Sequence, residues 1–493
     1  MFKIIRQYVK ATDWFYLLMC VCCSALSVVT LISIGMDNGG FAVDSFTGAI
    51  TGLGKYRDVL IQAVASLLGL GCAVLLSCVD YRGLVKIWPV HVSITWGLVL
   101  LTLTGLTIGP VTLGYTPSGT DNQSWLILGP LSLQPTELAK ISFILTFAMH
   151  LDNVRERINE PKVLAKLLLH ILVPVGIIHI QGDDGTGIVF ATIGCMMLFA
   201  AGISWKYILS AVALGSAGLA AVLNFFPDKL KGYQVDRIMA LWFYPDDPKY
   251  RDIMQQQKGG RVSIGSGQIF GNGFFHDGHA YVINAQDDFI FSYLAQCVGF
   301  VGCIVVLALL FGIAIRTLTT GLRSEDHIGT YICVGVFATM AWQIIINLGM
   351  NTMLLPVIGV TLPFFSAGGS SVLMMYLCVG LVTSVYMHNK KRLFSDCAGQ
   401  LEKQNPPAVC SQSTRRAAFF CVIPETAGRG RTPAQSCKSA GCRHWRGAAA
   451  ADKDSAQRCR TAEERPAAVF PPRNPAPPFP TRWTPPARRI PDF

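Results

Sequence analysis

The sequence predicts an all-α integral membrane protein with about ten transmembrane helices, one long extracytoplasmic loop at residues 227–288 and a disordered C-terminal tail. Two observations carry this prediction. Of the 493 residues, 51% are hydrophobic and only 14% are charged, whereas about 25% of the residues of a soluble domain are charged. Apolar runs of about 20 residues also recur along the chain, and each can cross a hydrocarbon core only as a helix. The composition therefore argues against a large soluble enzyme.

The net charge of +11 belongs mainly to the C-terminal tail, residues 395–493. The tail holds 16 Lys and Arg against 8 Asp and Glu, so the basic excess does not indicate a nucleic-acid-binding surface. It also holds 14 of the 26 prolines and no apolar run long enough for a core, which predicts disorder. We therefore expect a membrane domain at 1–394 and a cytoplasmic tail at 395–493. The tail either contacts anionic lipid or is a non-functional extension.

The predicted transmembrane helices follow one another through mostly short connections, with loop 227–288 as the main exception. The fourth helix is short, and a tight polar turn separates the fifth from the sixth. Their approximate ranges are 14–35, 58–79, 84–104, 137–151, 164–181, 186–203, 205–226, 289–315, 329–349 and 367–388.

The distribution of Lys and Arg predicts the orientation, because short cytoplasmic loops are enriched in both residues. The basic residues near the N-terminus and after the fourth, eighth and tenth predicted helices all fall on one side of the membrane. Loops 105–136, 182–185 and 351–366, on the other side, contain no Lys or Arg. Both termini are therefore expected in the cytoplasm, and loop 227–288 outside.

Loop 227–288 is the candidate active site, because connections of this length are usually functional or disordered. It is rich in Gly, aromatic residues and paired charges, and it ends in Asp287 and Asp288, where the loop enters the membrane. Arg237 lies near its beginning. The alternative role for Asp288 is structural, as the cap of the eighth transmembrane helix.

The start of the fourth predicted helix carries the next candidate residues. Pro135, which follows Gln134, suits the first turn of a helix, and Glu137 and Lys140 are three residues apart, so they share a face. Ionisable residues inside a transmembrane segment usually face a cavity or a partner and are functional by default. The alternative is an ion pair that only fixes helix packing.

Two glycine-containing turns complete the set. Asp183 follows Gly182 between the fifth and sixth predicted helices, where glycine lets a ligand or another backbone come close. A plain polar turn is the alternative there. Ser366 and Gly368-Gly369 open the tenth helix, and they either offer backbone N–H groups to an anion or allow close helix packing.

In order and spacing, these stretches resemble the SEDS family of RodA, FtsW and SpoVE, which are bacterial cell-wall glycosyltransferases. The resemblance covers about residues 10–392 and leans toward RodA-like members. The matching motifs are Gln123-Ser124-Trp125, Gln134–Lys140, Gln181 with Asp183-x-Gly185-Thr186, Tyr233-Gln234-x-x-Arg237, Ile264–Gly267, Asp288–Phe291 and Leu355–Ser371.

The resemblance implies that the protein polymerises lipid II, a disaccharide-peptide carried on undecaprenyl diphosphate. It implies that Asp288 is the catalytic base, and Asp287 is expected to raise the pKa of Asp288 by like charge. Arg237 is expected to bind the leaving diphosphate, alone or with a divalent cation, magnesium or manganese. The remaining expected substrate-binding residues are Gln134, Glu137, Lys140, Asp183, Ser366, Gly368 and Gly369.

The resemblance further implies a location in the bacterial cytoplasmic membrane and a class B penicillin-binding protein as the partner. It does not separate roles in elongation, division and sporulation. Two other functions stay open. Ten spans with polar residues at mid-depth would suit a flippase for a lipid-linked sugar equally well, and a catalytically degenerate member would act only as a scaffold.

The chain departs from the family pattern at three places. The family usually has Pro after the Gln of the Gln181 motif and a hydrophobic residue after the Asp, where this chain has Gly182 and Asp184. Ile283-Asn284 replaces the usual Pro-Glu before the final Asp, and Gln296-Cys297 replaces an acidic pair in the eighth helix. Asp288 itself is retained.

Overall fold

The computed structural model describes residues 2–37, 54–116, 122–129, 131–225, 232–243, 246–276 and 278–404. The predicted disordered tail lies outside the described residues from residue 405 onward.

A long helix stands at each of the ten predicted transmembrane segments. Six of these helices are long and apolar enough to cross a membrane, and α5 and α8 are shorter apolar helices. The ten are α2 (Trp14–Asp37), α3 (Gly54–Cys78), α5 (Trp88–Thr102), α6 (Pro135–Val154), α7 (Pro161–Ile180), α8 (Asp184–Ala200), α9 (Trp205–Phe225), α12 (Ile290–Leu322), α13 (His327–Asn351) and α14 (Gly369–Gln404). The chain is therefore a multi-pass membrane protein, as the composition predicts.

Several shorter elements lie between or beside these helices. They are α1 (Phe2–Ala11), α4 (Tyr81–Lys86), η1 (Arg155–Arg157), α10 (Gly232–Trp242), η3 (Pro248–Tyr250) and α11 (Arg251–Ser266). The predicted loop 227–288 thus contains two helices and a 3-10 turn in its described part. Helix α14 also continues to Gln404, ten residues beyond the expected end of the membrane domain.

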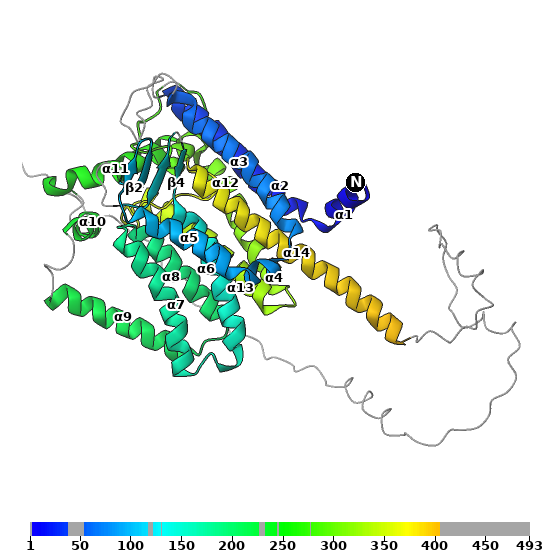
Figure 1. Ribbon diagram of the computed structural model, residues 1–493. Helices are drawn as coiled ribbons and strands as arrows, with labels where there is room; N and C mark the ends of the chain where they lie inside the picture. The colour runs from blue at the N-terminus through cyan, green and yellow to red at the C-terminus, as the bar shows by residue number, and fades with distance from the viewer. Residues whose placement is uncertain are drawn as a thin grey trace, which may run out of the picture. The chain divides into compact units, whose positions relative to one another are not determined.

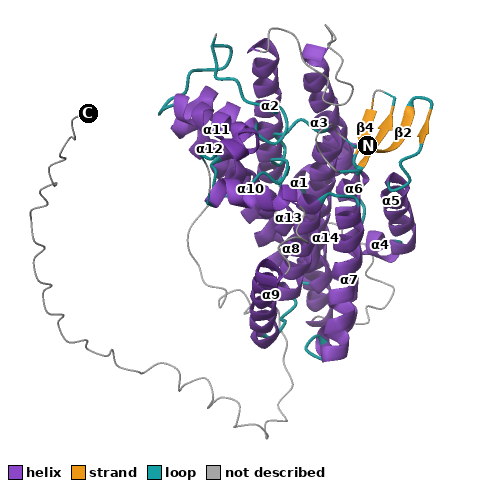
Figure 2. Ribbon diagram, turned by 90° about the vertical axis from the view of Figure 1, so that its left-hand side faces the viewer, coloured by secondary structure: helices purple, strands orange, loops and turns teal. Residues whose placement is uncertain are grey.

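A small antiparallel sheet connects α5 to α6, although the sequence predicted only a loop there. Its strands are β1 (Thr107–Ile108), β2 (Val111–Tyr115), β3 (Trp125–Leu128) and β4 (Leu131–Leu133), in the order β1-β2-β3-β4. Strands of two to five residues are too short to show a reliable alternating pattern. The sheet lies at the same end of the helical bundle as α10 and α11 (Figure 2).

Helices α13 and α14 form the centre of the bundle, where they pack against α6 and α12 (Figure 1). Within the apolar windows of α13 and α14, 72% and 83% of the residues are buried, compared with 22% for α3. Polar side chains on these two helices are consequently held inside the protein rather than in lipid.

Helix α12 is broken at Gly299, whose φ of 66° is in the left-handed region that favours glycine. The segment after α11 fills this break. The amide nitrogens of Asn272 and Gly273 donate to carbonyls of α12 at 2.9 Å, and that of Phe300 donates to the carbonyl of Gln268 at 2.9 Å. Backbone groups freed at membrane depth must be paired inside the protein, so the break fixes loop 227–288 against α12.

Candidate functional site

Asp287 and Asp288 are half-buried at the end of the long loop, immediately before α12. Two side chains of α13 hold this point. The amide nitrogens of Asn347 and Asn351 donate to the backbone carbonyl of Asp288 at 2.8 and 3.0 Å. Asn351 Oδ1 also accepts from the hydroxyl of Ser292 at 2.6 Å. The backbone at Asp288 is therefore positioned by buried amides of another helix.

The Asp288 carboxylate does not cap α12. The N-cap residue of this helix is Phe289, which makes no side-chain capping hydrogen bond. In the first turn, the amide of Ser292 donates instead to Oδ1 of Asn351 at 3.1 Å. Asp288 therefore does not have the alternative role of a helix cap. Its carboxyl group remains available for chemistry at the boundary between loop and membrane.

Burial raises the pKa of Asp288 to about 6, and the Arg237 guanidinium offsets part of that effect. The pKa of Asp287 is also raised well above its usual range, first by burial and then by the charges of Asp288 and Asp58. Both carboxyl groups therefore take up a proton more readily than an exposed aspartate does. The sequence prediction attributed the raised pKa of Asp288 to the charge of Asp287, whereas desolvation is its cause here.

Arg237 lies on α10, in the first half of the loop, and is half-buried. Its Nη1 atom donates a hydrogen bond to the backbone carbonyl of Val357, in the loop between α13 and α14. That contact fixes the guanidinium while its charge acts on Asp288. The side chains of Tyr233 and Gln234, from the same motif, lie outside those that the structure describes.

Glu137 and Lys140 form an ion pair in the first turns of α6. Lys140 Nζ is 2.7 Å from Glu137 Oε1. The Lys140 side chain is 1% exposed and the Glu137 side chain is 5% exposed. The second carboxylate oxygen, Oε2 of Glu137, has no hydrogen-bond partner among the described residues. The pair is therefore electrically compensated, and one buried acceptor atom remains.

Gln134 and Asp183 form hydrogen bonds that link the first turns of α6, α8 and α14. Gln134 Nε2 donates to Asp183 Oδ2 at 2.8 Å, and its backbone nitrogen donates to the hydroxyl of Ser370, near the start of α14, at 3.2 Å. Asp183 caps α8 by accepting from the amide of Thr186 at 3.1 Å. Burial raises the pKa of Asp183, and Lys140 partly offsets this while Glu137 adds to it. Gln134, Glu137, Lys140 and Asp183 thus belong to one polar cluster, as the sequence predicted.

In this structure Ser366, Gly368 and Gly369 have structural roles in a backbone turn and in helix packing. The hydroxyl oxygen of Ser366 accepts from the amide of Leu362 at 2.8 Å and closes a turn. A Cβ on Gly369 would lie 3.3 Å from Ile61 of α3, so the packing alternative is realised there. The amide of Ala367 donates to the carbonyl of Gln286 at 2.8 Å, which ties the start of α14 to the loop that carries Asp287.

At each of the three departures from the family pattern, the structure shows a backbone conformation or a hydrogen bond that suits the residue present. Gly182 has a φ of 80°, which proline cannot adopt because its ring fixes φ near −65°. Asn284 has a φ of 56°, a conformation that asparagine tolerates better than most residues. Gln296 Oε1 accepts from the hydroxyl of Ser263 at 2.6 Å and joins α12 to α11.

The candidate residues therefore form two groups. Asp287, Asp288 and Arg237 meet at the loop boundary, together with Asp58 of α3. The cluster of Gln134, Glu137, Lys140 and Asp183 lies where α6, α8 and α14 begin. The sequence reasoning missed Asn347 and Asn351, although two amides at i and i+4 within an apolar segment are the signal that could have found them.

A polytopic helical membrane protein with a structured outer loop, a carboxylate at the loop boundary and a buried polar cluster is the class that this fold and site define. The family model for the cell cycle proteins FtsW, RodA and SpoVE matches residues 42–391. The chain belongs to this family.

Individual relatives agree. The chain is 33% identical over 273 residues to peptidoglycan glycosyltransferase MrdB of Escherichia coli strain K12, covering 54% of this chain and 72% of the relative. Two solved structures are also similar, each with 26% identity and 77% of this chain covered. One is a chain of a peptidoglycan synthase complex, 98% covered with a TM-score of 0.59. The other is the rod shape determining protein RodA of Thermus thermophilus, 97% covered with a TM-score of 0.52.

Proposed function

We propose that the protein is a peptidoglycan glycosyltransferase that polymerises lipid II into glycan strands. One observation carries this proposal. A carboxyl group with a pKa of about 6, Asp288, stands at the boundary between loop and membrane, beside the cation Arg237. A general base is most effective when its pKa lies near the working pH. The family relationship supplies the reaction class in which such a base is needed.

The proposed reaction joins two lipid-linked sugars. A hydroxyl oxygen of the acceptor sugar attacks the anomeric carbon of the donor, and the Asp288 carboxylate takes the hydroxyl proton. A new glycosidic C–O bond forms as the bond between the anomeric carbon and the diphosphate oxygen breaks. The diphosphate leaves with the bonding electrons, and the guanidinium of Arg237 stabilises its charge.

The polar cluster at the starts of α6, α8 and α14 supports the reaction from beneath the loop. Glu137 Oε2 is a buried acceptor without a partner in the described part of the chain, and it suits a hydroxyl or amide donor of the substrate. Gln134 and Asp183 are already hydrogen-bonded to each other, so they orient this wall of the site. Ser366, Gly368 and Gly369 shape the turn beside it.

A divalent cation is a further part of the proposal. Among the residues that the structure describes, no three His, Cys, Asp or Glu side chains gather into a complete metal site. A magnesium or manganese ion would therefore be held chiefly by the substrate diphosphate and water, with at most one carboxylate at the loop boundary, which leaves the Asp288 carboxylate to take the proton. It would supply charge neutralisation for the leaving group.

The proposed orientation rests on the distribution of Lys and Arg among the short loops. With both termini in the cytoplasm of a bacterial cell, loop 227–288 and Asp288 face outward, where glycan strands are assembled. A class B penicillin-binding protein is the proposed partner, because a solved relative belongs to a peptidoglycan synthase complex. Cross-linking of the glycan strands would be that partner's task.

The function is tested with the purified full chain and labelled lipid II, without an energy source or ion gradient. The expected result is formation of glycan polymer. Translocation of lipid II across vesicles without polymer would select a flippase instead. Neither polymer nor translocation, with intact binding of the partner, would select a scaffold.

A further inference from the structure

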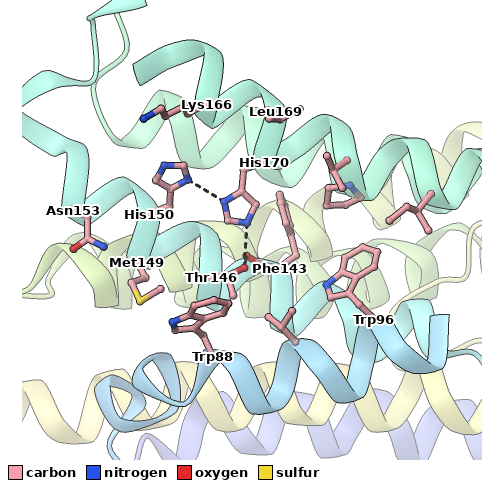
Figure 3. Close-up of a pocket in the computed structure, with 14 residues that line it drawn as sticks. Trp88, Trp96, Phe143, Thr146, Met149, His150, Asn153, Lys166, Leu169 and His170 are labelled. Carbon is pink, nitrogen blue, oxygen red and sulfur yellow. Dashed lines mark hydrogen bonds between the residues drawn. The ribbon is translucent and has the colours of Figure 1, made fainter. Parts of the chain in front are cut away.

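A cavity of about 650 Å³ opens between α5, α6 and α7, away from the proposed active site. Figure 3 shows its lining. His150, which lines it, is 13 residues along α6 from Glu137, so about 20 Å separates their positions on the helix axis. The polar end of the cavity, at His150, is therefore remote from the Glu137–Lys140 cluster.

The cavity is amphipathic along its length. Trp96, Phe143 and Ile177 line one part of it, toward the side where α6 begins and α7 ends. Lys166, His150 and Asn153 lie together at the opposite end, where α6 leads into α7 (Figure 3). Such a lining matches a ligand with an apolar chain and a polar head.

The wall of the cavity is open toward the surroundings of the helices. Leu169 is 60% exposed and Val173 is 50% exposed, both on α7. Because α7 is one of the helices long and apolar enough to cross a membrane, this exposed surface faces hydrocarbon. A ligand would therefore enter sideways from the membrane rather than from water.

The polar end carries the positive charge of Lys166, an exposed side chain that forms no hydrogen bond or ion pair with the residues that the structure describes. His150 and His170 share a hydrogen bond, with their Nδ1 atoms 3.0 Å apart, and His170 Nε2 is 3.4 Å from the hydroxyl of Thr146. The adjoining loop between α6 and α7 adds no net charge, because Arg155 and Arg157 are balanced by Glu156 and Glu160. Lys166 is therefore the charged group of the cavity lining.

We propose that this cavity binds an anionic phospholipid of the surrounding membrane. One acyl chain lies along the apolar floor between α5 and α7, and the headgroup phosphate contacts Lys166 and His150. Basic pockets between transmembrane helices on the cytoplasmic side are known to bind anionic headgroups. In the orientation given above, the lipid belongs to the cytoplasmic leaflet, whereas the proposed lipid II chemistry takes place at the outer face.

Two tryptophans in the lining make the proposal measurable. The full chain in detergent micelles is titrated with phosphatidylglycerol or phosphatidylcholine whose acyl chains are brominated, because bromine quenches nearby tryptophan fluorescence. The contribution of the cavity is the quenching lost in the variant that combines Trp88→Phe with Trp96→Phe. We expect brominated phosphatidylglycerol to reach half of this quenching at about fivefold lower lipid concentration than brominated phosphatidylcholine.

Charge and shape variants separate the two parts of the site. Lys166→Ala should remove the preference for phosphatidylglycerol, whereas Lys206→Ala, which removes an exposed lysine at the start of α9, should keep it. Val92→Phe, which fills the cavity from α5, should weaken quenching by both lipids. Equal quenching by both lipids in the unmodified chain would overturn the proposal. Relief of the quenching by soluble glycerol phosphate would also overturn it, because a phosphate site would then need no acyl chain.

Discussion

Two ionisable sites in this protein handle buried charge in opposite ways. Glu137 and Lys140 neutralise each other at 2.7 Å inside the bundle. Asp287 and Asp288 stand side by side at the loop boundary, where burial raises the pKa of both, and a backbone hydrogen bond and the charge of Arg237 offset part of this effect at Asp288. Both sites contain carboxylates removed from water, yet only one of them is paired with a cation at contact distance.

The difference teaches which carboxylate can exchange a proton during a reaction. A carboxylate that contacts a lysine is stabilised in its charged form and has little tendency to accept a proton. A desolvated carboxylate without such a partner has a raised pKa and accepts a proton near neutral pH. We therefore assign the proton transfer to the loop boundary, and the shaping and binding of substrate to the buried cluster.

The largest effect on the polymerisation rate is expected from replacing the Asp288 carboxylate. Asp288→Asn keeps the size of the side chain but cannot take the proton of the attacking hydroxyl. Polymer formation should fall by about 10²- to 10⁴-fold, which is the usual worth of general-base catalysis. The measurement is the initial rate of lipid II polymerisation by purified protein.

Asp287→Asn is the matched control for that variant, since it changes the neighbouring carboxyl group in the same way. Because a neighbouring carboxyl group only tunes the pKa of the base and does not take the proton itself, the rate should change by less than about tenfold. Equal losses in the two variants would contradict the assignment of distinct roles. A near-normal rate for Asp288→Asn would reject Asp288 as the base.

Breaking the ion pair tests the other side of the comparison. Glu137→Ala and Lys140→Ala each leave one buried charge without its partner, which costs about 3–5 kcal/mol. The double variant should lose less stability than the sum of the two single variants. Denaturant unfolding in detergent measures all three. Strict additivity would show that the two charges do not interact.

Replacing Asn351, which holds the backbone of Asp288, should have a smaller effect on stability. Asn351→Ala removes the donor to the Asp288 carbonyl and the acceptor for Ser292, which costs about 1–3 kcal/mol of stability. Thr352→Ala is the control on the same helix, because the Thr352 hydroxyl is exposed and contacts only backbone carbonyls of its own helix. Thermal unfolding of both variants is the measurement. Equal shifts in the midpoint would show that Asn351 does not hold the Asp288 backbone.

Much of the fold could be predicted because apolar runs determine membrane helices. All ten expected segments coincide with helices, and the Glu137–Lys140 spacing correctly placed both charges on one face. The short strands β1 to β4 were missed because each is stabilised by its neighbours and not by its own pattern. Helices α10 and α11 were missed for a similar reason, since buried groups such as Gln257 secure α11 through distant contacts, here with the carbonyls of Met350 at the end of α13 and Leu355 in the loop after it.

The site was predicted in part. Asp183, Gln134 and the ion pair lie together as expected, because polar residues in apolar surroundings must find one another. The support of Asp288 by Asn347 and Asn351 could not be derived, since it depends on how α13 packs against α12. The raised pKa values of Asp287 and Asp288 depend first on burial, which a sequence does not record.

The most direct test of the central claim is the pH dependence of lipid II polymerisation by the unmodified protein. The base must be ionised to act, and burial raises the pKa of Asp288 to about 6. The rate should therefore be constant above this pKa and fall as the pH drops through it, approaching about tenfold per pH unit at lower pH. The residual rate of Asp288→Asn should lack this fall. A flat profile between about pH 5 and about pH 8, or the same fall in Asp288→Asn, would contradict proton transfer to Asp288.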